Sequence, residues 1–503
     1  MTWLNKPIIF NIVTAVTVIL AVLLRFLAIH MYDIQIDELI YQHFAQAIAS
    51  GYLPLNYYDI PFFLHPPGYY VALSVWRTIF WHGSDIFAQL TVLRSFNIIL
   101  SGFTALIIIL LTRIVTKKNN LAIITGVLFA LDPFAIRLNT RGLMETMAML
   151  LLLIGLWSLF RNTNNPESGR KTWLLTGLLF GLAIVTKDVA AIFLFFAFVI
   201  MTLRKVGPDL KVLFRYIIPT AILPYVIWIS IVASTGHIGE LLSEKTLGVR
   251  RFFGLVQVTG FNSSSAPSKS DTLLSTLPHY ASSYIIMGLS ILGMLLLLKS
   301  KDKNRRMWGC IAAASILAIG YLIIGGTFEE QYLYYLLVPS LFTIVVATLE
   351  LEQIIPSTYR FFVRIGGKLG IAILFLFGLT TYIINMSSAD NGWQKTIEWV
   401  NANVPPNSTI CVYAQGQLIL GEEDYNVCSW HSLSDINAHH VQYIIDPEKL
   451  TQSNYVPLTD KDIADIKPES KVVFSYNSRD SGKFLIFELP RFANAPGPSH
   501  NKK

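Results

Sequence analysis

Two adjacent carboxylates, Asp37 and Glu38, follow the first long apolar run of the chain. Charged groups at the edge of a membrane are costly to desolvate, so the pair indicates a site that handles protons or cations. It also opens an amphipathic segment, residues 36–48, which predicts an interfacial helix. A helix N-terminus favours ionised carboxylates, which could accept a proton from a hydroxyl or bind a divalent cation. The alternative is an ordinary solvated loop.

Other polar residues lie near the ends of later apolar runs. His65 precedes two prolines, which either aim His65 and Tyr69 at a cavity or simply start a helix. Arg137, Arg141 and Glu145 recur every four residues, which would stack them along one helical face. Either an arginine there binds a phosphate, or Arg141 and Glu145 form a structural pair.

Basic residues in two further places could contact an anion. Lys187 lies between two apolar runs and could bind a phosphate or pair with a loop acid. Arg250 and Arg251 lie in a long polar loop, where double arginines are often solvated. Tyr332 follows two glutamates whose position is explained by helix capping. The sequence contains no Walker loop, HExxH, GxSxG or paired CxxC pattern.

The composition predicts a polytopic α-helical membrane protein. Of 503 residues, 53% are hydrophobic and 14% are charged, whereas a soluble protein has about 25% charged residues. The apolar runs reach the length of about 20 residues that a membrane-spanning helix needs. We expect about 11 spans, at 8–30, 90–113, 120–137, 143–160, 172–186, 189–203, 214–234, 280–298, 307–325, 332–349 and 369–386. The net charge of +7 comes from short basic clusters between these runs, so it does not indicate nucleic acid.

The basic clusters predict the orientation of the chain. With these spans, all of them fall on the side of the N-terminus, which the positive-inside rule places in the cytoplasm. Residues 67–82 would reverse this pattern if they crossed, so we expect them to lie in the outer interface. The polar residues described above then face outward. ATP and nucleotide sugars are cytoplasmic, so an enzyme acting there would need a donor delivered by the membrane, such as a group linked to a lipid phosphate.

The chain divides by composition near residue 390. Residues 1–390 form the predicted transmembrane domain, whose first outer loop, 31–89, carries the interfacial helices. Residues 391–495 are expected to form a small extracytoplasmic α/β domain with strands at 409–413, 441–445, 472–476 and 484–488, and 496–503 a flexible tail. Cys411 and Cys428 lie in this domain and could form a disulfide or remain thiols.

Together these features resemble the GT-C membrane glycosyltransferases. The resemblance is closest to protein O-mannosyltransferases, lipid A aminoarabinose transferases and lipopolysaccharide-core transferases. It rests on five motifs in order over about residues 1–390. They are Asp37-Glu38, His65-Pro66-Pro67, Arg137/Arg141 with Glu145 (where the family more often has Asp), Thr186-Lys187, and Tyr332 to Pro339. The central loop lacks a β-trefoil-like insertion, which argues against a protein acceptor.

The resemblance implies an inverting transfer of a sugar from a polyprenyl-phosphate donor to an acceptor hydroxyl. Asp37 would be the general base, and Glu38 would orient the acceptor or help to hold a metal. The departing phosphate would be stabilised by basic residues, namely Arg137 or Arg141, Lys187, Arg250 and Arg251. Substrate would be positioned by His65, Tyr69, Glu145 and Tyr332. A divalent cation, Mg²⁺ or Mn²⁺, is compatible with this scheme, but no cofactor is certain.

The expected partners are the lipid-linked donor, a lipid, glycan or protein acceptor, and the plasma membrane, with no nucleic acid. The alternative function is a transporter or flippase of lipid-linked saccharides, which would predict inverted repeats and broken helices at mid-membrane. A non-catalytic scaffold is a third reading, and it would leave the polar residues without a common purpose.

Overall fold

The computed structural model describes most of the chain. The described residues are 4, 6–52, 56–57, 60–80, 85–165, 167–256, 269–326, 328–413, 415–421, 425–428, 433–452, 460–479 and 481–490. The predicted tail, 496–503, lies outside them.

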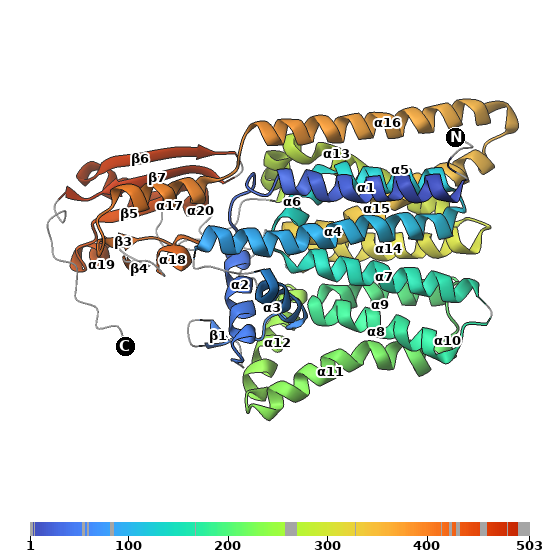
Figure 1. Ribbon diagram of the computed structural model, residues 1–503, viewed down its shortest axis with the longest axis horizontal. Coiled ribbons are helices and arrows are strands. Elements are labelled where there is room, and N and C mark those ends of the chain that lie inside the picture. The colour runs from blue at the N-terminus through green and yellow to red at the C-terminus, as the bar shows by residue number, and fades with distance from the viewer. Residues whose placement is uncertain are drawn as a thin grey trace.

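A bundle of long, nearly parallel helices forms the larger part of the molecule (Figure 1). The apolar runs of the sequence form these helices because a buried backbone in an apolar setting must satisfy its own hydrogen bonds. The bundle contains α1 (Pro7–Leu27), α4 (Ile86–Thr116), α5 (Asn119–Leu131), α6 (Pro133–Thr140), α7 (Met144–Asn164), α8 (Arg170–Thr186), α9 (Val189–Leu203), α10 (Leu210–Val212) continuing through a π-helical turn (Leu213–Ile217) into α11 (Ile218–Ser234), α13 (Lys269–Leu298), α14 (Lys303–Ile324), α15 (Tyr334–Ile354) and α16 (Ser357–Ser387).

Eight of the described helices are long and apolar enough to cross a membrane, and the bent pair α5–α6 would make nine. The expectation of about 11 spans includes two further, shorter helices. The difference lies in α8 and α9, which have only 17 and 15 residues. At 1.5 Å per residue, neither reaches the roughly 30 Å of a hydrocarbon core. They nevertheless pack along α7, α11 and α14 as members of the bundle.

The predicted span 120–137 is broken rather than straight. α5 and α6 meet at an angle of 62°. Asp132 ends α5 in an extended conformation, and its side chain accepts a hydrogen bond from Ala135 N (2.8 Å), which caps α6. Pro133 follows as the first residue of α6, a position that suits its fixed φ angle. The break turns α6 across the end of the bundle.

The loops that carry the basic clusters join helices at the end of the bundle where the chain begins (Figure 1). This is the arrangement that the predicted spans require. At the opposite end lie α2 (Ile36–Ala49), α3 (Gly68–Phe80), α12 (Ile238–Phe252) and a short hairpin of β1 (Asn56–Tyr57) and β2 (Ile60–Pro61). A helix is thus present where one was expected at 36–48, and residues 68–80 form a helix too short to span.

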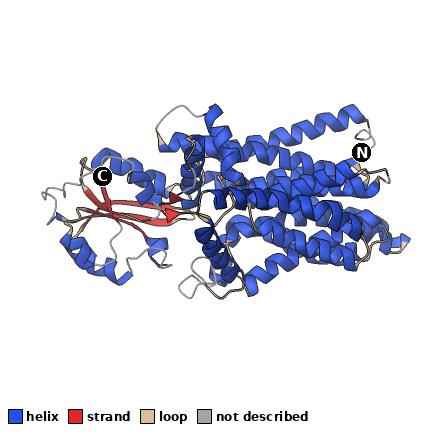
Figure 2. Ribbon diagram, turned by 90° about the horizontal axis from the view of Figure 1, so that it is seen from below, coloured by secondary structure: helices blue, strands red, loops and turns tan. Residues whose placement is uncertain are grey.

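The C-terminal domain lies beyond that same end (Figures 1 and 2). Its five-stranded sheet has the order β4-β3-β5-β7-β6, with β3 (Thr409–Cys411), β4 (Asn426–Cys428), β5 (Tyr443–Pro447), β6 (Lys471–Ser478) and β7 (Gly482–Glu488). Figure 2 shows helices on both sides of this sheet. They are α17 (Gly392–Asn403), α18 (Gln415–Leu420), α19 (Leu433–Ala438), α20 (Glu448–Gln452) and α21 (Asp460–Ile466).

Side chains of β7 alternate between two cores, as the two-residue period of a strand requires. Phe484 and Ile486 pack in the cluster that contains Trp393 of α17, whereas Leu485 and Phe487 face the other cluster. The sequence predicted four of the five strands, and β4 was missed. Cys411 is a buried thiol rather than half of a disulfide, and its Sγ lies 3.5 Å from Tyr413 Oη.

Candidate active site

Asp37 lies in the first turn of α2, at the end of the bundle that faces the C-terminal domain. Its side chain is half-buried. It feels the charges of three residues from distant parts of the chain, Glu145, Lys187 and Glu329, and Gln331 hydrogen bonds to it. Burial raises the pKa of Asp37 to about 6, the neighbouring Glu329 and Glu145 carboxylates raise it further, and Lys187 opposes them. The group is therefore a stronger base than an ordinary carboxylate, yet it is ionised at neutral pH.

Lys187 is the cation at the centre of this acidic group. It ends α8 and its Nζ lies 3.0 Å from Glu145 Oε1, with both side chains almost fully buried. The same Nζ lies 5.7 Å from the centre of the Tyr332 ring. Burial alone would lower the pKa of Lys187, but the surrounding carboxylates outweigh it and raise the pKa. Lys187 therefore stays charged and balances part of the acidic cluster.

Arg251 lies in the same region, where it forms an ion pair with Glu329. Its Nη2 lies 3.2 Å from Glu329 Oε1, and Gln331 Nε2 donates to the other oxygen of that carboxylate (2.9 Å). The preceding residue behaves differently, because Arg250 is exposed on α12. Of the predicted arginine pair, only the second is thus brought to the site.

A cavity of about 600 Å³ opens beside Lys187. Its polar and charged lining side chains form one group, the polar end, namely His65, Lys187, Asp188, Lys245, Arg251 and Tyr332. Most of its wall is apolar and comes from α9, α11 and α12, including Val189, Ile192, Ile229 and Phe252. A second, almost wholly apolar cavity of about 420 Å³ shares Ile192, Phe252 and Phe253 with it and extends the apolar surface. The shape suits a ligand with an anionic head and a long hydrocarbon tail.

Lys245 was not singled out in the sequence. Its Nζ donates to Asp188 Oδ2 (2.8 Å) and to Leu64 O (2.9 Å), and it lies 5.0 Å from the Trp228 ring. His65 stands at the same end of the cavity. Burial lowers the pKa of His65 well below its usual value, and Lys187, Lys245 and Arg251 lower it further, so the imidazole is neutral. No local pattern marks Lys245, since its partners lie far away in the chain.

Glu38 points away from Asp37 and is held by Arg94 of α4, which was also missed. Arg94 Nε donates to Glu38 Oε1 (2.9 Å) and Arg94 Nη2 to Oε2 (2.8 Å). The same carboxylate accepts hydrogen bonds from Gly142 N (2.7 Å) and Gln35 N (3.0 Å). Burial raises the pKa of Glu38, but Arg94 and these hydrogen bonds outweigh it and keep the pKa below its usual value.

The hydrogen bonds of Glu38 decide whether the Asp37–Glu38 pair could hold a metal ion. Both oxygens of Glu38 already accept hydrogen bonds, so Asp37 and Glu38 do not present a shared pair of ligands to a cation. Across the described part of the chain, no group of three or more His, Cys, Asp or Glu side chains is placed to hold a metal ion. The Asp37–Glu38 pair thus does not fit the divalent-cation site considered from the sequence.

Arg137, Arg141 and Glu145 do not stack along one face, so that prediction is wrong. α6 ends at Thr140 and α7 begins at Met144, which breaks the helical repeat. Arg137 pairs with Glu330 (2.8 Å), Arg141 lies 3.8 Å from Asp390 of the C-terminal connection, and Glu145 turns to Lys187. Arg141 therefore lies on the side of the C-terminal domain, and neither arginine lines the large cavity.

Tyr69 is fully buried and donates a hydrogen bond to Asn97 Oδ1 (3.2 Å), and it is not part of the cavity lining. Two other tyrosines were missed, Tyr41 and Tyr70. Their rings lie 5.5 Å apart, and both hydroxyl oxygens are buried without a hydrogen-bond partner. Both feel the charge of Asp37. Tyr41 follows Asp37 by four residues, which is the spacing that places two side chains on one helical face.

Comparison with protein families, curated proteins and solved structures shows what this chain is similar to. The family model for dolichyl-phosphate-mannose-protein mannosyltransferase matches residues 64–228, and no curated protein matches the sequence significantly. The apo oligosaccharyltransferase of Archaeoglobus fulgidus superposes with a TM-score of 0.61 at 14% identity, over 97% of this chain and 75% of the other.

ArnT from Cupriavidus metallidurans, solved with undecaprenyl phosphate, gives a TM-score of 0.58 at 11% identity over 99% of this chain and 100% of that one. The archaeal oligosaccharyltransferase AglB from A. fulgidus, in complex with an inhibitory peptide and a dolichol-phosphate, gives 0.59 at 14% identity over 96% and 74%. The chain is a multi-pass membrane protein with the fold of the GT-C superfamily of membrane glycosyltransferases.

Proposed function

We propose that the protein transfers a sugar from a polyprenyl-phosphate donor to an acceptor hydroxyl, with inversion at the anomeric carbon. The observation that carries the proposal is the position of Lys187. It contacts the acidic cluster around Asp37 and also lines the cavity with a cationic end and an apolar wall. A base and a site for a lipid phosphate therefore meet at one residue.

The cavity supports a donor of this class. Arg251, Lys245 and Lys187 offer positive charge at its polar end, and the apolar walls of α9 and α12 suit an isoprenoid chain. Two proteins of the same fold were solved with undecaprenyl phosphate and a dolichol-phosphate. Developing charge on the leaving phosphate is the largest change in such a reaction, so cations at that point would lower the barrier.

Asp37 would act as the general base. The acceptor oxygen attacks the anomeric carbon, its proton passes to a carboxylate oxygen of Asp37, and the bond from carbon to the phosphate oxygen breaks. The lipid phosphate leaves with the bonding electron pair. A pKa of about 6 leaves Asp37 ionised at neutral pH and more basic than an exposed aspartate.

The other predicted residues take different parts in this scheme. Glu38 would hold the start of α2 through Arg94 rather than touch the acceptor. Glu145 would keep Lys187 in place, and His65 and Tyr332 would line the donor site. Arg137 would pair with Glu330, and Arg141 would contact Asp390 at the start of the C-terminal domain. We place this domain outside the plasma membrane and the N-terminus in the cytoplasm, because the basic loops lie with the N-terminus.

The test is turnover of a panel of radiolabelled polyprenyl-phosphate sugars by purified protein in detergent. Wild type should release or transfer the sugar, and Asp37→Asn should bind the donor but lose turnover. Asp85→Asn is the matched control, because Asp85 caps α4 through Ala88 N (2.8 Å) and asparagine caps equally well.

Equal turnover by wild type and Asp37→Asn would remove Asp37 from the mechanism. Absence of turnover with every donor, together with donor movement across reconstituted vesicles, would replace the transferase proposal with a flippase.

A further inference from the structure

The segment Met31–Ile34 connects α1 to α2 and leads within three residues to Asp37. It therefore sets where α2 begins. In a chain whose proposed base lies in the first turn of a helix, the path of the preceding residues decides where that base points. This segment is held from two sides.

The bundle holds one side through Arg94. Besides its bond to Glu38, this guanidinium donates from Nη1 to Ile29 O (2.7 Å) and Tyr32 O (3.0 Å), and from Nη2 to Asp33 O (3.2 Å). One buried side chain thus fixes three backbone carbonyls before α2 and the carboxylate inside its first turn.

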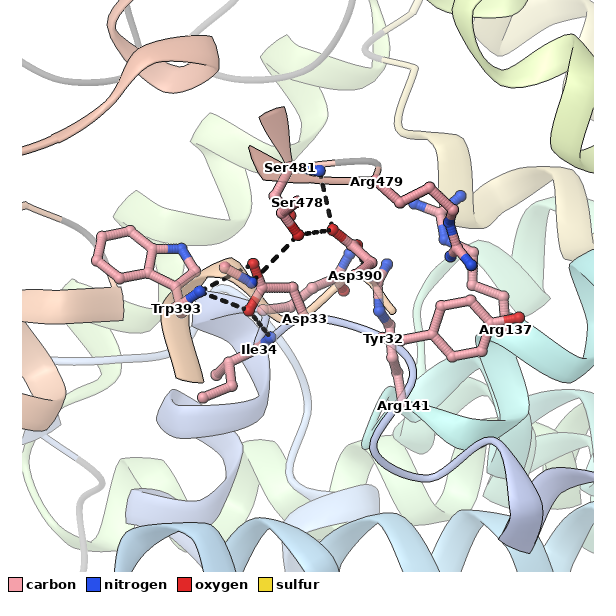
Figure 3. Close-up of polar contacts among 12 residues, drawn as sticks. Tyr32, Asp33, Ile34, Arg137, Arg141, Asp390, Trp393, Ser478, Arg479 and Ser481 are labelled. Carbon is pink, nitrogen blue, oxygen red and sulfur yellow. Dashed lines mark hydrogen bonds and ion pairs between the residues drawn. The ribbon is translucent and has the colours of Figure 1, made fainter. Parts of the chain in front are cut away.

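The C-terminal domain holds the other side. Asp390 N donates to Met31 O (3.0 Å), and Trp393 N in the first turn of α17 donates to both oxygens of Asp33 (3.1 and 3.2 Å). The Arg479 guanidinium, from the turn between β6 and β7, lies 5.3 Å from the Tyr32 ring. Figure 3 shows these groups converging on the segment from α17 and the β6–β7 turn.

The contact is continuous and buried. Asp390 accepts hydrogen bonds from Ser478 Oγ (2.6 Å) and Ser481 N (2.9 Å), which tie the β6–β7 turn to it (Figure 3). Asp33 and Asp390 are 3% and 0% exposed. From the bundle, Arg141 lies 3.8 Å from Asp390 and 5.7 Å from the Tyr32 ring. The two domains therefore meet around this segment through a set of directed polar contacts.

We propose that Asp33 is a positioning residue, through which the C-terminal domain fixes the start of α2 and hence Asp37. Hydrogen bonds are directional, so they define the path of the segment more tightly than apolar contact of equal area would. Burying two carboxylates side by side is costly, and burial together with Asp390 raises the pKa of Asp33 to about 7. A contact that merely joined the two domains would not require buried carboxylates, so their energetic cost indicates a positioning role.

This inference rests on the proposed role of Asp37, and it predicts a split in the kinetics. The donor cavity is lined mostly by residues of α9, α11 and α12 and includes none of the residues of this contact. Loosening the contact should therefore reduce kcat and leave donor binding unchanged. A misplacement of about 1 Å at a reacting group can reduce a rate about 100-fold.

The experiment compares Asp33→Ala with Asp33→Asn in the full chain. Alanine removes the acceptor for Trp393 N, whereas asparagine keeps a carbonyl oxygen there. We expect Asp33→Ala to lose about 100-fold in kcat with an unchanged KM for the donor, and Asp33→Asn to recover most of the loss. Asp446→Ala is the matched control, because this aspartate is as buried but bonds Thr451 within the C-terminal domain (2.6 Å).

Amide hydrogen exchange in detergent gives a readout that does not depend on the reaction. Asp33→Ala should increase exchange in peptides covering residues 31–40, and Asp446→Ala should not. Wild-type protection of that segment in Asp33→Ala, or a kcat equal to that of wild type, would overturn the inference. If wild type turned over no donor while exchange changed as expected, the proposed function would fail and the positioning contact would stand.

Discussion

The two neighbouring arginines of α12 offer the sharpest test of the proposed donor site. Arg251 lines the large cavity and pairs with Glu329 at 3.2 Å, whereas Arg250 is exposed on the same helix. Replacing each by glutamine removes one positive charge from the same turn. If only overall charge matters, the two variants should bind a polyprenyl phosphate equally weakly. If Arg251 contacts the phosphate, only Arg251→Gln should bind it more weakly than wild type.

The size of the expected effect follows from the burial of Arg251, whose side chain is 15% exposed. A hydrogen bond to a charged group contributes about 1.5–3 kcal/mol. Since about 1.4 kcal/mol is a factor of ten in affinity, Arg251→Gln should weaken the binding of a polyprenyl phosphate about 10- to 150-fold. Loss of the pair also leaves the Glu329 charge less neutralised beside the phosphate, which acts in the same direction.

The assay is the Kd of radiolabelled undecaprenyl phosphate in detergent or nanodiscs, with the free protein folded as judged by its thermal unfolding. Arg250→Gln should bind like wild type. Equal weakening in both variants would show that only overall charge matters. An unchanged Kd in Arg251→Gln would refute the assignment of the phosphate to this end of the cavity.

Three further outcomes follow from single residues. The pKa of Asp37 is raised from 3.8 to about 6, so the proposed base is protonated below that pH. We expect kcat/KM to fall with acidification below pH 6 and to level off above it; a flat profile from pH 5 to 8 would contradict this. Arg94→Ala leaves Glu38 buried without its cation and should lower the free energy of unfolding by about 3–5 kcal/mol. Adding Glu38→Gln should recover part of that loss, and a melting temperature like that of wild type would count against the pairing. A Cβ at Gly68 would come within 2.7 Å of a backbone carbonyl of α8, so Gly68→Ala should destabilise the protein, whereas Gly239→Ala, with open space around it, should not. Comparable melting temperatures for the two would exclude this close approach.

Much of the bundle could be predicted because local patterns determine it. Apolar runs and the alternation of basic loops predicted helices that begin and end at the observed sides, and the amphipathic pattern at 36–48 predicted α2 to within a residue. Two residues of the sequence motifs, Lys187 and Glu145, lie near Asp37 in the structure. These features depend on hydrophobic periodicity and charge, which a single sequence carries.

The pairings within the site could not be predicted in the same way. Arg94 and Glu38 are 56 residues apart, and Arg137 and Glu330 are 193 apart, so no spacing links them. The regular interval from Arg137 to Arg141 suggested one helical face, but the helix ends between Thr140 and Met144. β4 was missed because a strand of three residues carries too little pattern, and it exists through its pairing with β3.

The apolar wall shared by the two cavities, formed by Ile192, Phe252 and Phe253, has a consequence for how a lipid donor would be encountered. Such a donor need never leave the bilayer, so its search is two-dimensional. The relevant concentration is then its mole fraction among the surrounding lipids rather than its amount per litre. Diluting the membrane with inert lipid at constant total donor would slow the enzyme, while adding water would leave its rate per protein unchanged.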